Sequence, residues 1–471
     1  MSENPLWLHQ RQCIDMAKDR HYLALFMGLG TGKTRTQIEI TRNLINLHKR
    51  LLRVVIFAPL SVCPQWKAQF LAYSKAKEED LHVLTGPGKG RVDAISKITK
   101  GIIITNYEAV TIAPFFDALL KWSPEVLVCD ELHFCKSPTS VRSKKIFQLA
   151  QHTPYRFGLT GTPILNTPMD LFSQYRILDL GANFGTNFYI FRKLYCIDKN
   201  AGMPKQRYFP KWVVKPEAEK FFAEVMAKTS FQAKKEDCID LPPLVKVVHK
   251  VQMSLEQRRA YESMKREFVA EIGGVQTTAE FAMTKSLRMQ QIICGFVQEN
   301  EDGDAKWVKD NSRLDALEEL LQTIGKEKCI IWTCFRPTYK KIAEVCTKVG
   351  LSFAFLTGLE SAAEKQESLD KFKKDTQILI SNPASGGTGI SMEFSSYAIY
   401  YARSYNLSHF LQSESRNYRG GSNQHERVTH VHLAAENSLD EVIYDALSKK
   451  QKIGETILEW AVEKGLQSET K

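Results

Sequence analysis

The sequence lacks the features that would place it in a membrane-spanning, secreted or zinc-binding class. No apolar run approaches the roughly 18 residues that a membrane-spanning helix needs. The N-terminus, Met1-Ser2-Glu3-Asn4-Pro5, lacks the basic and then apolar layout of a secretory signal. None of the ten cysteines forms a Cys-x-x-Cys pair, and Cys129, Cys294 and Cys329 lie inside apolar runs. We therefore expect a soluble, intracellular protein whose thiols are free and buried.

The size and charge of the chain set its broad class. Its 471 residues suffice for two or three domains, and its 43% hydrophobic and 25% charged residues are ordinary for a globular protein. Lys and Arg number 64 against 53 Asp and Glu, which gives a formal net charge of +11. This excess favours a polyanionic partner such as nucleic acid.

A glycine-rich segment near the N-terminus predicts a phosphate-binding loop. It reads Met27-Gly28-Leu29-Gly30-Thr31-Gly32-Lys33-Thr34 and lies between an apolar strand-like run at residues 23–27 and a helical pattern at 34–49. The backbone N–H groups of such a turn, here those of Gly30, Thr31 and Gly32, point at one spot, and the helix N-terminus adds a partial positive charge. We expect Lys33 to reach the β- and γ-phosphates of ATP and the Thr34 hydroxyl to bind Mg²⁺.

Two adjacent carboxylates supply the second half of a nucleotide-hydrolysing site. Asp130 and Glu131 follow an apolar strand-like run at residues 125–129, and open α/β sheets bind ligands at the carboxyl ends of their strands. We expect Asp130 to hold Mg²⁺ through a water molecule and Glu131 to orient or deprotonate the attacking water. The alternative, an acidic pair that only caps a helix, does not explain the preceding strand or the upstream loop. Together the two segments predict an ATPase.

Strand-like and helical segments alternate in two separate blocks, which is typical of parallel sheets with helical crossovers. The predicted strands of the first block are residues 53–58, 101–105, 126–129 and 156–159. Those of the second block are residues 329–333, 353–356, 377–381, 397–401 and 428–433. The fold class is therefore α/β, with two lobes.

The region between the two blocks has a different, helical texture. Its predicted helices are residues 216–228, 255–272 and 278–297, followed by a polar loop at 300–304. A last helix is predicted at 453–464. We expect an N-terminal lobe at 1–240 with a helical insertion at about 181–235, a C-terminal lobe at 241–455 with a helical insertion at about 255–305, and a tail at 456–471.

Further motifs follow in order along the whole chain. They are Leu6-Trp7-Leu8-His9-Gln10, Pro59-Leu60-Ser61-Val62-Cys63-Pro64-Gln65-Trp66, Thr160-Gly161-Thr162-Pro163 with Asn166, Gly386-Gly387-Thr388-Gly389-Ile390, Gln412-Ser413-Glu414-Ser415-Arg416-Asn417-Tyr418-Arg419 and Ser438-Leu439-Asp440-Glu441. Together with Asp130-Glu131-Leu132-His133, this ordered set resembles the Swi/Snf-type DNA translocases of helicase superfamily two. The resemblance implies two RecA-like lobes with parallel sheets and helical insertions between them.

Several positions depart from the pattern of that family. Met27 and Leu132 replace the commoner small residues, Gln232 and Ala233 stand where two arginines are usual, Lys365 where the family often has arginine, and Ser422 where it usually has glutamine. These changes affect contacts between the lobes and with DNA, whereas the residues of hydrolysis are retained.

The resemblance assigns further residues to the nucleotide. Gln10 would read the adenine base, and Gly389 and Gln412 would contact the nucleotide from the second lobe. Arg416 and Arg419 are expected one turn apart on a helix, where they face the same side. As arginine fingers they would stabilise the charge that spreads over the γ-phosphate oxygens. Two solvated surface arginines are the alternative, and Gln412 at the spacing of the family decides against it.

Residues at strand ends are expected to hold the nucleic-acid backbone. They are Ser61, Trp66, Thr105 and Tyr107 in the first lobe and Gly387 and Thr388 in the second. Trp66 and Tyr107 could instead be packed aromatic residues. Thr160 and Thr162 would couple the nucleotide site to this grip. Backbone contacts carry affinity without sequence information and weaken with salt.

The leading functional prediction is an ATP-dependent translocase on double-stranded DNA that acts as a monomeric motor, with ATP and Mg²⁺ as cofactors. A targeting protein is a further expected partner, because the chain is close to a bare motor of prokaryotic or viral type. One alternative is a strand-separating DNA or RNA helicase, although no element that would split a duplex is recognisable in the sequence. A second alternative is a nucleic-acid-binding switch that is controlled by ATP and has little turnover.

Overall fold

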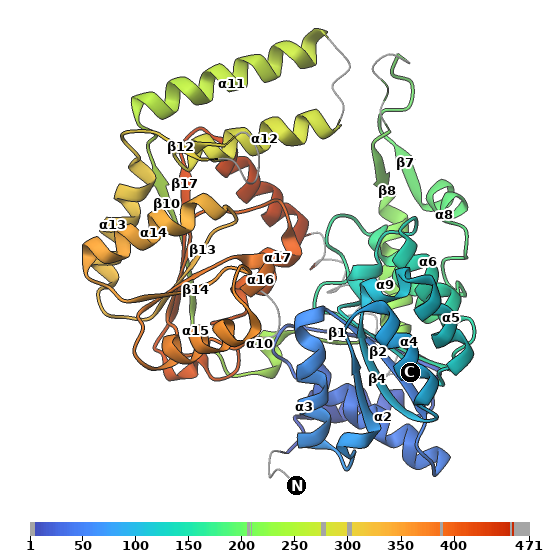
Figure 1. Ribbon diagram of the computed structural model, residues 1–471. Helices are drawn as coiled ribbons and strands as arrows, with labels where there is room; N and C mark the ends of the chain where they lie inside the picture. Colours follow the sequence, from blue (N-terminus) through green and yellow to red (C-terminus); the bar gives the residue numbers. More distant parts are fainter. Residues whose placement is uncertain are drawn as a thin grey trace. The chain divides into compact units, whose positions relative to one another are not determined.

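The computed structural model describes residues 5–204, 208, 210–274, 279–298, 304–386, 390–452 and 455 (Figure 1). The segment Gly387-Thr388-Gly389 lies outside the described residues, as do nearly all of the predicted loop at 300–304 and helix at 453–464. The chain divides into two compact units. The N-terminal unit comprises Met1–Ala201, Phe209–Ile239 and Lys450–Lys471, and the C-terminal unit comprises Gly202–Tyr208 and Asp240–Lys449.

The N-terminal unit is built on a seven-stranded, wholly parallel sheet with the strand order β3-β4-β2-β5-β6-β1-β9. The strands are β1 (Tyr22–Met27), β2 (Arg53–Ala58), β3 (Leu81–Leu84), β4 (Gly101–Asn106), β5 (Val126–Asp130), β6 (Tyr155–Leu159) and β9 (Ser230–Ala233). Successive residues of a strand point to opposite faces. In β2, Val55 and Phe57 pack into one apolar cluster, whereas Val54 and Ile56 pack into another. Because both faces are buried, these strands form uninterrupted apolar runs in the sequence.

Helices cover both faces of this sheet. The cluster that contains Val54 is closed by α1 (Leu8–Ala17), α2 (Lys33–His48) and α3 (Cys63–Tyr73). The cluster that contains Val55 is closed by α4 (Gly88–Lys97), α5 (Ala113–Trp122), α6 (Val141–Ala150), α7 (Asp170–Leu178) and α9 (Pro216–Thr229). Since all seven strands are parallel, the loops that follow β1, β5 and β6 lie along one edge of the sheet, where open α/β sheets bind their ligands.

The region at 181–235, which the sequence predicts to be helical, also contains three strands. After α8 (Phe188–Tyr195), β7 (Cys196–Asp198) and β8 (Trp212–Val214) form an antiparallel hairpin. The Asp198 carboxylate accepts the backbone N–H groups of Asn200 at 3.0 Å and Lys211 at 2.7 Å. The third strand, β9, adds to the sheet beside β1. Strands of three or four residues carry too little alternation to be recognised in a sequence.

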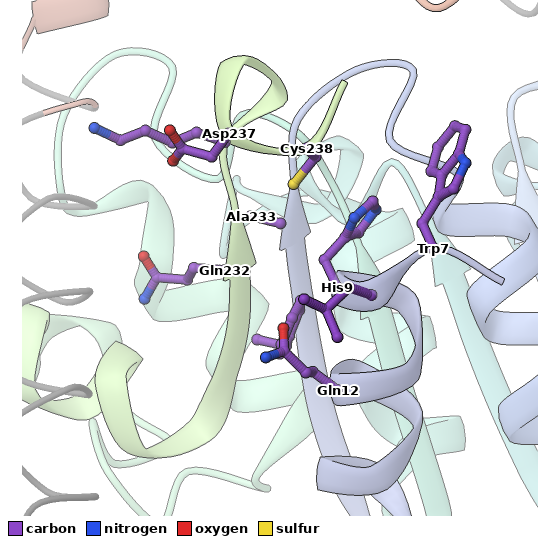
Figure 2. Close-up of a pocket in the computed structure, with 10 residues that line it drawn as sticks. Trp7, His9, Gln12, Gln232, Ala233, Asp237 and Cys238 are labelled. Carbon is purple, nitrogen blue, oxygen red and sulfur yellow. The ribbon is translucent and has the colours of Figure 1, made fainter. Parts of the chain in front are cut away.

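A pocket of about 670 Å³ lies against the first helix of the N-terminal unit. Trp7 and the α1 residues His9 and Gln12 line one part of it, and Ala233 of β9 and Cys238 of α10 (Lys235–Cys238) line another. Figure 2 shows the side chains of His9 and Cys238 facing one another across this space. The volume is in the range of small-molecule sites, which are roughly 300–1,000 Å³.

The C-terminal unit contains a second, six-stranded parallel sheet with the order β10-β17-β16-β13-β15-β14. Its strands are β10 (Leu244–Val251), β13 (Cys329–Trp332), β14 (Phe353–Leu356), β15 (Ile378–Ser381), β16 (Tyr397–Tyr400) and β17 (Val428–Ala435). The strand β10 is missing from the sequence-based prediction because it lies at the sheet edge and most of its side chains are exposed. Two parallel α/β sheets in two units confirm the predicted fold class of two RecA-like lobes.

The helices of the C-terminal unit include seven that precede β17, and the chain is helical again at residues 439–452, after that strand. The seven are α11 (Leu255–Gly274), α12 (Ala279–Ile293), α13 (Ser312–Ile324), α14 (Arg336–Val349), α15 (Ala362–Lys374), α16 (Pro383–Gly386) and α17 (Leu407–Glu414). The helix predicted at 278–297 is too long, because Gly295 takes a φ of 86° and the chain then forms β11 (Phe296–Val297), which pairs with β12 (Lys306–Trp307). Across the described part of the chain, no helix has the length and apolar character needed to cross a membrane.

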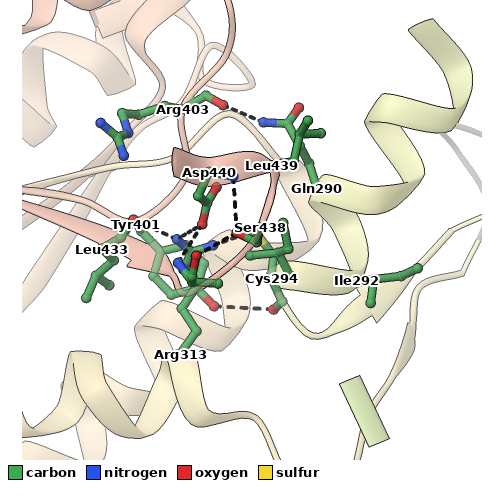
Figure 3. Close-up of polar contacts among 12 residues, drawn as sticks. Gln290, Ile292, Cys294, Arg313, Tyr401, Arg403, Leu433, Ser438, Leu439 and Asp440 are labelled. Atoms are coloured by element: carbon green, nitrogen blue, oxygen red, sulfur yellow. Dashed lines mark hydrogen bonds and ion pairs between the residues drawn. The ribbon is translucent and has the colours of Figure 1, made fainter. Parts of the chain in front are cut away.

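A buried ion pair joins the end of the C-terminal sheet to α13 (Figure 3). The Arg313 Nη2 atom lies 2.6 Å from Asp440 Oδ2 and donates to the Leu433 carbonyl at 2.7 Å. The same carboxylate oxygen accepts the backbone N–H of Ala435 at 3.1 Å. Burial favours the neutral form of the Arg313 guanidinium, but the adjacent Asp440 charge raises its pKa. Asp440 belongs to the Ser438-Leu439-Asp440-Glu441 motif, which therefore closes the fold of this unit.

Replacing Asp440 with asparagine should destabilise the C-terminal unit strongly. Asp440→Asn leaves the charge of Arg313 buried without its partner, which costs about 3–5 kcal/mol. Thermal unfolding monitored by circular dichroism measures the loss, and Asp445→Asn, an exposed site one turn away, is the matched control. Equal melting temperatures for the two variants would contradict the structural role given to the ion pair.

Candidate nucleotide site and arginine segment

The glycine-rich loop connects the end of β1 to the start of α2. Gly30 and Gly32 have φ values of 88° and 81°, which side-chain-bearing residues rarely adopt. The Lys33 ammonium is buried and donates to the carbonyls of Met27 at 3.0 Å and Gly28 at 3.1 Å. The Met27 side chain packs in the apolar cluster of α1, α2 and α3. Methionine can therefore replace the usual glycine at this position, because only its carbonyl faces the lysine.

Helix α1 packs directly against this loop. A Cβ atom on Gly32 would lie only 2.3 Å from Gln10 Nε2, which donates to the Gly32 carbonyl at 3.2 Å. Gln10 Oε1 accepts the backbone N–H of Trp7 at 2.9 Å, and His9 Nε2 lies 2.9 Å from the Thr31 carbonyl oxygen. Gln10 thus has a structural role at the loop in addition to the base-reading role expected of it.

The acid turn, which we define as Asp130-Glu131, ends strand β5. Trp66 Nε1 donates to Asp130 Oδ2 at 2.8 Å, and the Tyr107 hydroxyl donates to the Asp130 carbonyl at 2.7 Å. Burial first, and then the neighbouring Glu131 charge, raise the pKa of the Asp130 carboxyl. Glu131 has a φ of 54°, a left-handed conformation that costs energy in a residue with a side chain. The surrounding contacts therefore hold a strained and electrostatically unfavourable turn in place.

Glu131 is connected through His133 to the loop that follows β6. The His133 Nδ1 atom lies 3.2 Å from Glu131 Oε2 and 2.9 Å from Thr160 Oγ1. The backbone N–H of Thr162 donates to Thr160 Oγ1 at 3.1 Å. The two threonines predicted to couple the site to nucleic acid are thus linked to Glu131 by hydrogen-bonding distances.

Leu132, the other departure in this region, is accommodated by a glycine. A Cβ atom on Gly158 of β6 would lie 2.4 Å from Leu132 Cδ2. The larger side chain at 132 therefore occupies the space that a side chain at 158 would need.

Three of the residues predicted to contact nucleic acid are inaccessible in this structure. Trp66, Thr105 and Tyr107 are fully buried within the N-terminal unit. The Thr105 hydroxyl donates to the Leu84 carbonyl at 2.7 Å, while the two aromatic side chains hold the acid turn. Ser61 is exposed, as a backbone contact would require. Gly387, Thr388 and the predicted nucleotide ligand Gly389 lie outside the described residues.

The arginine segment, residues 415–419, follows the end of α17. The prediction that Arg416 and Arg419 lie on a helix is wrong, since α17 ends at Glu414. Side chains compete there for the last helical carbonyls: both Ser415 Oγ and Arg416 Nε donate to Gln412 O, at 2.8 and 3.1 Å. The two guanidinium groups nevertheless converge, because Arg416 and Arg419 both donate to the Ile390 carbonyl, at 2.7 and 3.4 Å.

Comparison with known proteins identifies the family. The SNF2-related domain family matches residues 9–297, and the helicase conserved C-terminal domain family matches residues 312–421. The chain belongs to the SNF2-related family. As a member of that family, it is a helicase-like ATPase.

Individual relatives of this SNF2-related chain are distant. Putative protein p41 of Acyrthosiphon pisum secondary endosymbiont phage 1 is 22% identical over 447 residues, which are 92% of this chain and 94% of that protein. The human DNA annealing helicase and endonuclease ZRANB3 is 24% identical over 454 residues, and the matched part is 93% of this chain but 39% of ZRANB3. A Sulfolobus solfataricus SWI2/SNF2 ATPase core, solved in complex with dsDNA, matches all of this chain and 96% of that one, with 21% identity and a TM-score of 0.43.

The residues of the SNF2-related site fit a magnesium ion that a nucleotide brings with it. Among the described residues, no group of three or more His, Cys, Asp or Glu side chains could hold a metal ion by itself. Nucleotide-bound Mg²⁺ needs only one or two protein oxygens, because phosphates and water complete its shell. Thr34 at the start of α2 and the buried Asp130 carboxylate are such donors, and a cation would relieve the repulsion between Asp130 and Glu131.

A second ion pair holds the end of α17 beside the sheet of the C-terminal unit. Lys246 Nζ of β10 lies 2.6 Å from Glu414 Oε1, and His430 Nδ1 of β17 lies 3.7 Å from the same oxygen. Burial favours the neutral form of Glu414, but His430 and Lys246 lower its pKa to about 2. His430 Nε2 also lies 3.0 Å from Asn417 Oδ1 in the arginine segment. These contacts fix the backbone from which Arg416 and Arg419 extend.

Replacing Glu414 with glutamine should reduce stability in a pH-dependent way. The pKa of Glu414 is lower in the folded than in the unfolded protein. The contribution of Glu414 to the free energy of unfolding is therefore complete at neutral pH and is lost as the pH falls from about 4.5 toward 2. Glu414→Gln should therefore cost about 3 kcal/mol at pH 7 and progressively less below about pH 4.5. Urea unfolding at several pH values measures the difference. Glu344→Gln, an exposed site in the same unit, is the control, and a pH-independent cost would contradict the assignment.

Proposed function

We propose that this chain is an ATP-dependent translocase on double-stranded DNA. Hydrolysis would be coupled to closure of the two units and to movement along the DNA backbone, so that DNA is remodelled or a bound protein is displaced. The observation that carries the proposal is the chain of short distances from Glu131 through His133 to Thr160 and Thr162. It offers a route by which the state of the nucleotide reaches a second loop.

Each residue near the glycine-rich loop has a defined task in this proposal. The N–H groups of Gly30, Thr31 and Gly32 and the Lys33 ammonium bind the phosphates. Glu131 orients the attacking water and accepts its proton. Thr34 and, through water, Asp130 hold Mg²⁺, which when bound offsets negative charge on the phosphates.

Gln10 and the pocket beside α1 are proposed to receive the nucleoside part of ATP. Gln10 uses its carbonyl oxygen on Trp7 and one N–H on Gly32, which leaves its second N–H for a base edge. The pocket of about 670 Å³ is lined by the flanking residues Trp7 and His9. An indole ring at 42% exposure is able to stack on a purine.

Arg416 and Arg419 are proposed to stabilise the transition state from the C-terminal unit, together with Gln412 and Gly389. Both arginines donate to one neutral carbonyl, that of Ile390. Burial lowers the pKa of Arg419, with a partial offset from Glu393. Exchange of a neutral carbonyl for a charged phosphate oxygen would favour the arginines electrostatically, and such fingers are worth about 10³–10⁵ in rate.

The nucleic-acid partner is inferred from charge and family. The formal net charge of +11 favours a polyanion, and exposed Ser61 follows β2 at the ligand-binding edge of the sheet. We propose duplex DNA as the track, a monomer as the motor and a separate protein as the targeting factor.

ATPase measurements with different nucleic acids test the leading proposal. Duplex DNA should stimulate phosphate release more than single-stranded DNA or RNA, and the apparent affinity should fall steeply between 50 and 200 mM salt, by about 10³-fold if six or more phosphates are contacted. Lys33→Ala should lower turnover at least roughly 100-fold, because it removes a cation from the transferring phosphoryl group. Equal stimulation by single strands would count against a duplex track, and negligible turnover with every nucleic acid would favour the ATP-controlled binding switch.

The β7–β8 hairpin favours a second candidate function, that of a strand-separating helicase. Such an enzyme needs an element that enters between the strands of a duplex, and an antiparallel hairpin with exposed residues is a suitable one. Around this hairpin, Lys193, Lys199 and Lys211 are exposed, and Arg192 packs over the Trp212 ring at 4.3 Å. Basic side chains with a neighbouring aromatic residue match the chemistry of a nucleic-acid strand.

A forked DNA substrate distinguishes this second function from translocation without unwinding. If the hairpin separates strands, the wild type displaces a labelled strand, and Lys199→Ala/Lys211→Ala reduces displacement several-fold while duplex-stimulated ATPase is retained. Lys373→Ala/Lys374→Ala, which removes two exposed lysines at the end of α15, is the matched control. Absence of displacement by the wild type would exclude strand separation by this motor.

A further inference from the structure

Trp66 occupies an unusual position for a large side chain that is predicted to contact nucleic acid. It lies on α3, it is 0% exposed, and its ring packs in the apolar cluster beneath the sheet edge. Its single polar atom, Nε1, donates to Asp130 Oδ2 at 2.8 Å. The acceptor is itself only 7% exposed. A hydrogen bond to a buried carboxylate is stronger than one between neutral groups.

The N–H group is the feature that distinguishes tryptophan from the apolar aromatic residue phenylalanine at this position. A phenylalanine would supply an aromatic ring of similar character to the cluster, but it has no N–H group. Indole has one donor and no acceptor, so it can bind a carboxylate without competing for a cation. The donor binds Oδ2 and restricts the rotation of the carboxyl group, so the carboxylate meets a further ligand in a defined orientation.

The rest of the acid turn is held by different groups, so the contact from Trp66 is a distinct one. Tyr107 holds the Asp130 main-chain carbonyl, and His133 lies beside the Glu131 carboxylate. Among these side chains, that of Trp66 donates to the Asp130 carboxylate, which also accepts from the backbone of Glu131. The Trp66 indole therefore supplies the side-chain hydrogen bond that orients this carboxylate.

We infer that Trp66 is a positioning residue for the nucleotide-associated Mg²⁺, which it serves by holding Asp130 in the orientation that receives the hydrated ion. This inference rests on the proposed nucleotide site and goes beyond it, because Trp66 touches neither the nucleotide nor DNA. Groups that orient a metal ligand typically change metal affinity by about 10–100-fold when they are removed.

Trp66→Phe tests the inference because it keeps an aromatic ring at this position and removes the N–H group. The Mg²⁺ concentration for half-maximal ATPase should rise about tenfold, while binding of ADP in the presence of EDTA stays unchanged. Mn²⁺ binding provides a readout that does not depend on turnover. In the presence of ADP, the Mn²⁺ dissociation constant from electron paramagnetic resonance should rise by a similar factor.

Trp122→Phe is the matched control for loss of a buried indole N–H. Trp122 belongs to α5, is 8% exposed and donates to the Ile98 carbonyl at 2.8 Å, away from the acid turn. Its replacement should leave Mg²⁺ and Mn²⁺ dependence unchanged. If Trp66→Phe behaves like Trp122→Phe in both metal measurements, Trp66 serves packing only and the inference is overturned.

A second replacement covers the case in which Trp66→Phe does not fold. Benzothienylalanine at position 66 keeps the bicyclic shape and replaces the N–H with sulfur, so the core remains filled. A tenfold weaker Mn²⁺ affinity supports the inference, and unchanged affinity overturns it. A wild-type protein without Mg²⁺-dependent ATPase would instead refute the proposed function, and that result is distinct from either variant outcome.

Discussion

A carboxylate buried at the end of a central strand is the constraint on which the N-terminal unit depends. Asp130 ends β5, in the middle of a sheet that is covered on both faces, and burial together with Glu131 raises its pKa. Such a group is costly to keep ionised unless donors or cations surround it. The hydrogen bond from Trp66 and the nearby charge of Lys33 reduce that cost, and Tyr107 holds the main chain of the turn. The contacts from Trp66 and Tyr107 also hold the acid turn in one conformation.

The same edge brings together loops that are far apart in the sequence. The glycine-rich loop follows β1, the acid turn ends β5 and the loop that contains Thr160 and Thr162 follows β6. The order β5-β6-β1 makes these strands neighbours. Gly161 packs so closely that a Cβ atom there would lie 3.2 Å from the Met27 carbonyl oxygen. A conformational change in one of these loops can therefore be transmitted to the other two through direct contacts. The C-terminal unit uses a related arrangement, in which Glu414, His430 and Asn417 hold the arginine segment against its sheet.

The sequence was sufficient for features that depend on local pattern. The apolar runs of β2 and β14 predict those strands to the residue, because both faces of a parallel sheet are buried and the turns bound them. It was insufficient where pairing decides the structure. The edge strand β10 exposes most of its side chains, the β7–β8 hairpin has three residues in each strand, and α17 ends before Arg416 because side chains take its carbonyls. Trp66 and Tyr107 lie at motif positions that are typical of nucleic-acid contacts. Only the three-dimensional structure reveals that their polar atoms point inward to Asp130.

The position of Met27 changes how the phosphate-loop pattern should be read. Lys33 donates to the main-chain oxygen of residue 27. The side chain at this position is therefore constrained by packing in the hydrophobic interior and not by the ligand. Any residue that fits the interior beneath β1 can supply that oxygen. A sequence search that requires glycine at the first position of the loop selects for a small residue at the end of the strand. Such a search will miss ATPases that have a larger apolar side chain at this position.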